Sequence, residues 1–461
     1  MKYKVSLLTH QFSRDGVVAF YNSLIMQPVF VEGRIAKIMG ALGNFEKADF
    51  FKALDFVPDA LNLFQSLTEN KIIVAGHVDE KGIVQWYADE YTGRPKVKIM
   101  YMILTDLCNL ACEYCVIEQF ASDHVYRHMD EKTAEKALLT FSPLALAGEQ
   151  SKIILYGGEA TLNWKILVYV LSRVNEMKEQ GLYPQTLEVT LNSNGTTITP
   201  ERARMLKELG IRAVAISLDG DEIANSPRVF KGGQASFSKV IQGFQNCVDA
   251  GIDTGISCTL SEESLARFDE TLDFLLKSGV KSLGFNLMKP TKGYSVSEGY
   301  YERATECIIK AFTVFRENGI YEDRIMRKAS VFARRAIFPF DCAATGGNQM
   351  VIAPDGAIGI CHGTLASREN FVSHVDQGFD PVANPVWQEW SRRSPLNMPA
   401  CFSCPALGIC GGGCPTQAMV ESGSIWDVHK SFCIHAKMIL EWLIWDLYDS
   451  SVSQRGAPPA T

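Results

Sequence analysis

Three closely spaced cysteines carry the clearest chemical signal in this sequence. Cys108, Cys112 and Cys115 directly follow an apolar stretch that is predicted to be a strand. Three thiolates on one short loop can bind three irons of a cubane and leave the fourth iron open to another ligand. A zinc knot is the alternative, but structural zinc sites take four protein ligands, and no fourth Cys or His lies next to these three. The spacing therefore predicts a [4Fe–4S] site.

A second set of cysteines gathers in the last third of the chain, which has thirteen cysteines in all. Its members are Cys342, Cys361, Cys401, Cys404, Cys410, Cys414 and Cys433. Clustered cysteines in a long chain without an export signal are more often metal ligands than disulfides. The four from Cys401 to Cys414, taken alone, also fit a zinc ribbon. The remaining three lie in helix or strand patterns and are expected to be buried structural residues: Cys247, Cys258 and Cys307.

The elements that must position the first three cysteines form a repeating strand–helix pattern. The predicted strands are 97–104, 152–156, 186–191, 212–217, 254–260 and 281–287. The predicted helices are 131–141, 163–179, 200–209, 235–250 and 264–277, with another at 300–317. Strands that alternate with helices indicate parallel βαβ units, here a partial (β/α)6 TIM-type barrel. Ligands in such folds bind at the C-terminal ends of the strands.

Polar and glycine residues stand at those strand ends. Gly157, Gly158 and Glu159 follow the second strand, where glycine permits close backbone approach and a carboxylate suits an ammonium group. The other candidates are Asn194 after the third strand, Ser217 and Asp219 after the fourth, Arg228 beyond them, and Leu287 at the sixth. The alternatives are a structural turn for Asn194, a surface ion pair for Arg228 and core packing for Leu287.

The segment Cys108-Asn-Leu-Ala-Cys112-Glu-Tyr-Cys115 resembles the CxxxCxΦC motif of the radical S-adenosylmethionine (SAM) superfamily. The resemblance implies a cluster that splits SAM into methionine and a 5′-deoxyadenosyl radical. It also implies that Tyr114 approaches the adenine and that Gly157-Gly158-Glu159 receives the methionine amino group. Asn194, Ser217, Asp219, Arg228 and Leu287 would contact the rest of the cofactor. The fifth strand, 254–260, lacks the GxIxGxxE pattern of some members.

The seven later cysteines resemble the SPASM domain of peptide-modifying radical enzymes, at every cysteine position. That resemblance implies two auxiliary [4Fe–4S] clusters, and so three in the chain. The outer cluster would be bound by Cys401, Cys404, Cys410 and Cys433. The inner cluster would be bound by Cys342, Cys361 and Cys414, with one iron left for a side chain or for a substrate thiolate.

His362 directly follows Cys361. Anaerobic sulfatase-maturating enzymes resemble this chain in both cysteine motifs but carry a catalytic aspartate at that position. Thioether-forming peptide maturases tend to have histidine there, so the difference counts against formylglycine formation. His362 could accept a proton or have a structural role.

The N-terminal region has a different pattern. A β pair over 17–31 with a turn at 21–23, a helix over 33–44, a second helix from Asp59 and a strand over 71–74 predict a winged-helix-like domain. Its first helix carries only Arg34 and Lys37 as bases, which disfavours DNA recognition. In peptide-maturing radical enzymes a similar module binds a leader peptide as an added strand. A plain structural cap is the alternative.

Composition narrows the function further. The net charge of −7 and the hydrophobic content of 47% describe a globular chain without the basic surface that nucleic acid or an anionic membrane would require. No apolar run is long enough for a secretory signal or a membrane span, so the expected location is the cytoplasm. The expected domains are 1–95 (leader recognition), 96–320 (radical SAM barrel), 321–450 (SPASM) and 451–461 (flexible tail).

These patterns together predict a radical SAM enzyme that modifies a ribosomal precursor peptide, most simply by forming cysteine thioether crosslinks. A flavodoxin- or ferredoxin-type protein would supply the electron. The alternatives are a formylglycine-generating maturase, or C–C crosslinking or epimerisation by the same cysteine set. Rivals from other classes are an electron carrier or iron–sulfur sensor, which needs no barrel, and a zinc-dependent DNA-binding regulator, which the acidic balance disfavours.

Overall fold

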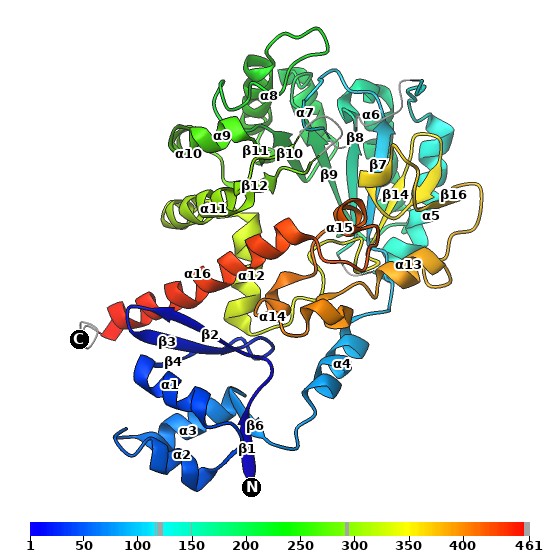
Figure 1. Ribbon diagram of the computed structural model, residues 1–461. Helices are drawn as coiled ribbons and strands as arrows, with labels where there is room; N and C mark the ends of the chain where they lie inside the picture. Colours follow the sequence, from blue (N-terminus) through cyan, green and yellow to red (C-terminus); the bar gives the residue numbers. More distant parts are fainter. Residues whose placement is uncertain (116, 118–122, 149, 291–294, 456–461) are drawn as a thin grey trace. The chain divides into compact units, whose positions relative to one another are not determined.

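The chain folds into two compact units, each built from separate segments (Figure 1). The computed structural model describes residues 1–461 except 116, 118–122, 149, 291–294 and 456–461. Unit 1 comprises Met1–Thr92, Arg327–Cys342 and Arg392–Thr461, and unit 2 comprises Gly93–Met326 and Ala343–Ser391.

Unit 2 contains a ten-stranded, mostly parallel sheet in the order β13-β12-β11-β10-β9-β8-β7-β14-β15-β16. Its first six strands along the chain are β7 (Ile99–Thr105), β8 (Lys152–Gly157), β9 (Glu188–Ser193), β10 (Ala213–Ser217), β11 (Asp253–Leu260) and β12 (Ser282–Leu287). All six pair in chain order and in parallel. The α/β class and the six barrel strands predicted from the sequence are confirmed.

A helix connects each parallel strand to the next, as a crossover connection requires. The helices are α5 (Glu131–Ala147), α6 (Trp164–Glu179), α7 (Pro200–Glu208), α8 (Phe237–Asp249), α9 (Glu262–Ala266), α10 (Phe268–Lys277) and α11 (Tyr300–Glu317), with a 3-10 turn at Ala160–Asn163 before α6. The single helix expected over 264–277 is interrupted at Arg267, which has non-helical dihedral angles (φ −127°, ψ 35°).

Part of the cysteine-rich region extends the barrel sheet. β14 (Gln349–Ile352) pairs in parallel with β7, and β15 (Ala357–Gly359) and β16 (Phe371–His374) continue it antiparallel. At the opposite edge, the short β13 (Tyr321–Glu322) pairs with β12. Val351 on β14 shares a buried apolar cluster with Ile103 on β7. α13 (Pro385–Trp390) closes this part of unit 2.

The N-terminal part of unit 1 carries two small antiparallel sheets and four helices. One sheet has the order β2-β3-β4 and the other the order β5-β1-β6. The strands are β1 (Lys2–Val5), β2 (Thr9–Arg14), β3 (Val17–Asn22), β4 (Val29–Glu32), β5 (Phe45–Glu46) and β6 (Ile73–Ala75). The helices are α1 (Gly33–Ala41), α2 (Lys47–Ala53), α3 (Ala60–Glu69) and α4 (Glu80–Tyr91).

The predicted elements of this region are present with one error. The Asp59 side chain caps α3 by accepting from the Asn62 N–H, 3.3 Å away. The turn predicted at 21–23 begins slightly later, because β3 continues through Asn22 and the turn towards β4 lies at 23–25. A second, tighter turn joins β2 to β3 at Asp15-Gly16, where both residues have positive φ (49° and 80°), the geometry that a two-residue hairpin needs.

The C-terminal part of unit 1 completes the same unit. α12 (Asp323–Arg334), which begins in unit 2, is a helix where the sequence predicted a basic connector. Short turns and helices follow: Pro395–Asn397, Pro399–Cys401, α14 (Leu407–Cys410) and α15 (Pro415–Ser422). The long α16 (Lys430–Arg455) includes 451–455 of the predicted tail, whose remaining residues, 456–461, lie outside the described residues. No helix among the described residues is long and apolar enough to cross a membrane.

The two parts of unit 1 share a core. Leu8 and Leu24 pack with Leu396 and Leu407 in one buried cluster. The ring of Phe30 on β4 also contacts α16, with a centroid separation of 4.9 Å from Tyr448. Figure 1 shows α16 running beside the β2-β3-β4 sheet.

Candidate functional site

A cavity of about 460 Å³ opens at the C-terminal ends of the barrel strands in unit 2. It is lined by Cys108, Cys112 and Cys115 and by eight of the predicted cofactor residues, namely Tyr114, Gly157, Gly158, Glu159, Asn194, Ser217, Arg228 and Leu287. Parallel strands present these residues at one edge because their C-terminal ends are in register. The geometry thus brings together residues that are up to about 180 positions apart in the sequence.

The cysteine loop is surrounded by hydrogen-bond donors. The Leu110 N–H lies 3.4 Å from the Cys108 Sγ, Asn194 Nδ2 lies 3.8 Å from the same sulfur, and Arg228 Nη1 lies 3.8 Å from the Cys112 Sγ. Such donors stabilise thiolates. The three cysteines therefore fit an iron–sulfur cluster, with Arg228 and Asn194 at its rim.

Asp219 differs from the other predicted residues because it lies behind the cavity wall. Its fully buried carboxylate pairs with Arg228 Nε and Nη2 at 2.8 and 3.1 Å and accepts from the Thr259 N–H at 2.8 Å. The Tyr114 hydroxyl also donates to it. Burial, partly opposed by the Arg228 charge, raises the pKa of Tyr114 well above its usual value. Asp219 thus orients Tyr114 and Arg228. Because Arg228 is only 8% exposed and its ion pair with Asp219 is buried, the alternative of a surface ion pair for Arg228 was wrong.

The two glycines before Glu159 are required by the backbone of the cysteine loop. A Cβ on Gly157 would lie 2.3 Å from the Thr105 carbonyl oxygen, and one on Gly158 would lie 2.6 Å from the Leu107 carbonyl carbon. Real Cβ atoms are not found this close to other heavy atoms. The Gly-Gly pair therefore lets the end of β8 approach the chain that leads into Cys108.

The buried carboxylate of Glu159 joins the ends of β8 and β9. It accepts from the Thr161 N–H at 3.0 Å, the Ser193 hydroxyl at 2.8 Å and the Asn194 N–H at 2.6 Å. These bonds fix the carboxylate at the cavity wall. Its predicted contact with a methionine ammonium group stays a prediction.

One wall of the cavity contains aromatic residues that the sequence did not indicate. Tyr101 on β7 and Tyr156 on β8 face the imidazole of His362, with ring centroids 4.7 and 5.1 Å away. The buried Nδ1 of His362 has no hydrogen-bond partner among the described residues. Burial, with a smaller contribution from Lys289, lowers the pKa of His362 to about 4, so the ring is neutral near pH 7.

A further polar group lines the cavity between β11, β12 and α12. Arg324 donates to the Phe285 carbonyl (2.7 Å) and to Asn286 Oδ1 (2.8 Å), and Asn286 donates to the Ser257 hydroxyl (2.9 Å). The place of Asn286 at the C-terminal end of a predicted strand was the signal that could have identified it, whereas Ser257 lies inside its strand and gave none. Arg324 had no such signal, because it lies on a helix that the sequence did not indicate.

The cysteines predicted to bind the outer cluster all belong to unit 1, and some of them raise the pKa values of others. Burial, together with smaller contributions from the neighbouring Cys404 and Cys433, raises the pKa of Cys401 to about 12. Burial likewise raises the pKa of Cys410, against an opposing hydrogen bond from the Gly412 backbone. Partly buried and buried thiols that influence one another in this way fit a bound cluster, since metal ligation removes their protons.

The loop from Cys410 to Cys414 has an unusual backbone. Gly411, Gly412 and Gly413 all have positive φ (72°, 83° and 66°), and a Cβ on Gly411 would lie 2.3 Å from the Asp341 nitrogen. Turns of this kind present successive N–H groups and form anion sites, including those around iron–sulfur clusters. The loop is thus suited to hold a thiolate-bound cluster.

The inner set is divided between the units, with Cys342 and Cys414 in unit 1 and Cys361 in unit 2. No three His, Cys, Asp or Glu side chains in the described part of the chain converge on a point that could hold a single metal ion. A cubane does not require such a point, because each thiolate binds a different iron. Cys247 and Cys258 are buried and Cys307 is partly buried, as a structural role predicts.

Comparison with known proteins agrees with this geometry. Residues 102–275 match the model of the Radical SAM superfamily. The uncharacterized protein MJ0907 of Methanocaldococcus jannaschii is 31% identical over 196 residues, which cover 42% of this chain and 64% of that protein. An AdoMet-dependent heme synthase of Nitratidesulfovibrio vulgaris is 26% identical over 202 residues, 43% of this chain and 50% of its own length. The chain thus spans about half to two thirds of these relatives.

A longer match is the serine-type anaerobic sulfatase-maturating enzyme of Klebsiella aerogenes, 23% identical over 326 residues, 67% of this chain and 77% of that one. Two kinds of solved structure share the fold. The structure of anSMEcpe with bound AdoMet and Kp18Cys peptide has a TM-score of 0.64 at 18% identity and covers 77% of this chain and 99% of its own. Streptococcus suis SuiB bound to S-adenosylmethionine has a TM-score of 0.52 at 13% identity, and the match covers 93% of this chain and 99% of the SuiB chain. The solved structures share the fold, and the match over residues 102–275 shows a radical SAM domain in that part of the chain, which contributes the three cysteines and most of the cavity lining.

Proposed function

We propose that this chain is a radical SAM enzyme that modifies a ribosomally made precursor peptide, with a cysteine thioether crosslink as the leading product. The observation that carries the proposal is a single cavity that combines the three-cysteine loop, the Tyr114–Asp219–Arg228 network and a neutral histidine on the wall formed by Tyr101 and Tyr156. That combination suits hydrogen abstraction followed by proton removal.

When bound, a [4Fe–4S] cluster and SAM supply a 5′-deoxyadenosyl radical that removes a hydrogen atom from a carbon of the substrate. The residues of the chain position this chemistry. By the family resemblance, Glu159 and the Gly157-Gly158 turn would receive the methionine end of SAM, and Tyr114 and Leu287 would approach its adenine; all five residues line the cavity. Arg228, held by Asp219, stands beside Cys112.

Closure of a thioether removes two hydrogens from the peptide. One leaves as a hydrogen atom, and the other leaves as a proton together with one electron. His362 Nδ1, buried and without a hydrogen-bond partner in the described part of the chain, is the proton acceptor in this scheme. The electron would pass to one of two auxiliary clusters bound by the seven later cysteines, and a flavodoxin- or ferredoxin-type protein would supply the electron that starts the reaction.

The leader of the precursor would bind along β4 in unit 1. β4 is an edge strand of the β2-β3-β4 sheet, and a cavity of about 1060 Å³ runs beside it, lined by Val29–Gly33, by Ser66 on α3 and by Leu447 and Tyr448 on α16. An extended peptide can pair with such an edge through its main chain. This is the role expected for residues 1–95.

Other products use the same residues. Formylglycine formation is disfavoured because position 362 is histidine, whereas C–C crosslinking and epimerisation remain alternatives within the peptide class. The heme synthase relative favours a second candidate, radical modification of a tetrapyrrole.

Anaerobic reconstitution of the full chain tests the proposal. We expect about twelve irons per chain for three cubanes and release of 5′-deoxyadenosine under reductant. Incubation with the short cysteine-bearing peptide encoded beside the gene should lower its mass by two hydrogens. An unchanged mass with one inverted residue would indicate epimerisation. Turnover of a coproporphyrin with no change in any peptide would contradict the peptide proposal.

A further inference from the structure

Unit 1 contains one arginine that is completely removed from solvent. Arg393 has an exposed fraction of 0%, and its guanidinium donates four hydrogen bonds, all to backbone carbonyls. The acceptors are Ile425, Gly412 at 2.7 Å, Gly413 at 3.4 Å and Asp427 at 3.1 Å. A buried charge is costly unless an opposite charge compensates it, and neutral carbonyls do so only in part.

The groups that would supply negative charge near Arg393 are cysteines, once they are deprotonated as cluster ligands are. Burial lowers the pKa of Arg393, whereas Cys414, Cys410, Cys401 and Cys342 raise it. Cys401 and Cys410 belong to the predicted outer cluster, and Cys342 and Cys414 to the predicted inner one. Two of the carbonyls that Arg393 binds, Gly412 and Gly413, lie in the loop between Cys410 and Cys414. The guanidinium therefore lies against the loop that links a predicted ligand of the outer cluster, Cys410, to one of the inner cluster, Cys414.

A second buried cation of unit 1 provides a contrast. Lys328 is also 0% exposed, but its ammonium pairs with the Asp341 carboxylate at 3.4 Å and lies over the ring of Phe432. Lys328 thus has a carboxylate partner within the protein, although Asp341 also pairs with Arg327 at 3.7 Å. No ion pair among the described residues joins Arg393 to a carboxylate, so its charge is not balanced in the way that Asp341 balances Lys328.

We propose that Arg393 is a positioning residue for the auxiliary clusters, whose fixed positive charge stabilises their reduced form while its hydrogen bonds hold the Gly412–Gly413 turn. The inference rests on the proposed function, because it assumes clusters at the seven later cysteines. Reduction adds one negative charge to a thiolate-bound cluster, and a nearby buried cation favours that state most where water is excluded. Arg393 would thereby make both clusters better electron acceptors for the crosslinking reaction.

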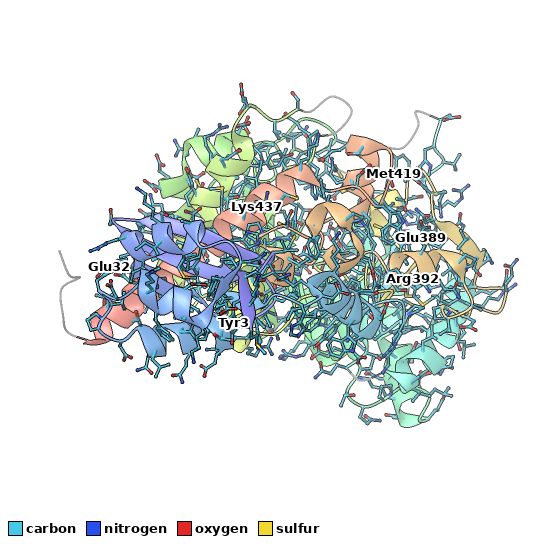
Figure 2. All side chains as sticks on the ribbon, turned by 60° about the horizontal axis from the view of Figure 1, so that its bottom comes forward. Tyr3, Glu32, Glu389, Arg392, Met419 and Lys437 are labelled. Atoms are coloured by element: carbon cyan, nitrogen blue, oxygen red, sulfur yellow. The ribbon has the colours of Figure 1, made fainter. Side chains whose placement is uncertain are left out.

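The test measures reduction potentials and does not depend on turnover. Potentiometric titration monitored by electron paramagnetic resonance would use the full chain in a Cys108→Ala/Cys112→Ala/Cys115→Ala background, so that only auxiliary clusters contribute. Arg393→Gln removes the charge, and Arg393→Lys keeps it. Lys437→Gln is the matched control, since Lys437 on α16 (Figure 2) also acts on Cys401 and Cys433 but is exposed, where solvent screens its charge.

Arg393→Gln should lower the equilibrium constant for one-electron reduction at least tenfold, which is about 59 mV towards negative potential. Arg393→Lys and Lys437→Gln should stay close to the parent, with iron content unchanged in all three. If the reduction potentials shifted equally in Arg393→Gln and Arg393→Lys, or in neither, the proposal that the charge of Arg393 stabilises the reduced clusters would be overturned. Equal loss of iron from both would show that Arg393 only clamps the backbone, which also overturns it. A parent without auxiliary iron would be recognised from its metal content alone, and would overturn the proposed function together with this inference.

Discussion

The cavity of unit 2 and the cysteine loops of unit 1 hold their functional residues in different ways. In unit 2, the cavity residues stand at the ends of paired strands, and hydrogen bonds such as Glu159 to Ser193 connect one strand end to the next. In unit 1, the cysteines lie in short turns, and three successive glycines with positive φ form the loop between Cys410 and Cys414. The sheet thus organises the first site without a cofactor, whereas the second would depend on metal for its order if clusters bind there as proposed.

The largest expected effect is the loss of SAM cleavage when one cysteine of the first site is replaced, without a loss of folding. Cys108→Ala should reduce 5′-deoxyadenosine release to the uncatalysed background, because a cluster with two ligands cannot present SAM for cleavage. The melting temperature of the purified apoprotein should stay within a few degrees of the parent, since the sheet carries the site. Unfolding of β7 in this variant would contradict the comparison.

Iron removal should affect the two regions unequally. After chelation under anaerobic conditions, backbone amides between 395 and 433 should exchange hydrogen at least about tenfold faster, because the loops lose the ligand that orders them. Amides of β7–β12 should exchange as before. Hydrogen exchange measured by mass spectrometry checks both regions in one experiment, and equal protection in both would refute the idea that only unit 1 depends on metal.

Asp219→Ala should destabilise unit 2 by about 3–5 kcal/mol, because it leaves the buried Arg228 charge without its partner. Asp253→Ala is the matched control. Its ion pair with Arg212 is about half exposed on both sides, so the expected change is below about 1 kcal/mol. Denaturant unfolding of the apoproteins measures both values. Similar losses in the two variants would show that burial of the pair is not the cause.

Gly158→Ala should lower the free energy of unfolding by about 1–3 kcal/mol, because the added methyl group would overlap the Leu107 backbone. Gly378→Ala, at a position with no atom within 4 Å of the added Cβ, should change stability by less than about 0.5 kcal/mol. Thermal unfolding distinguishes the two. If Gly158→Ala unfolds like the parent but no longer binds SAM, the glycine serves the cofactor alone.

Much of unit 2 could be predicted because its pattern is regular. Alternating strands and helices indicate a parallel sheet, and that sheet places Cys108, Glu159 and Arg228 at one edge whatever the intervening sequence. The role of Asp219 behind the wall could not be predicted, since a motif gives position along the chain but not depth. The aromatic wall was missed because Tyr101 and Tyr156 look like ordinary strand residues.

The features that could not be predicted depend on contacts between segments that are distant in the sequence. β14 and β15 have four and three residues, too few for a periodic signal, and they form because β7 offers an edge to pair with. The burial of Arg393 was also invisible, because a single arginine between Arg392 and Ser394 resembles a surface residue.

The interleaving of the two units has a consequence for synthesis. The chain passes between them four times, and Leu8 and Leu24 share their core with Leu396 and Leu407. The cluster around Leu8 and Leu24 therefore cannot close until residues 396 and 407 have been made, although the barrel segments between them can fold as they emerge. A ribosome stalled before residue 396 would leave this cluster without Leu396 and Leu407, so unit 1 is completed only after both segments of unit 2 have been made.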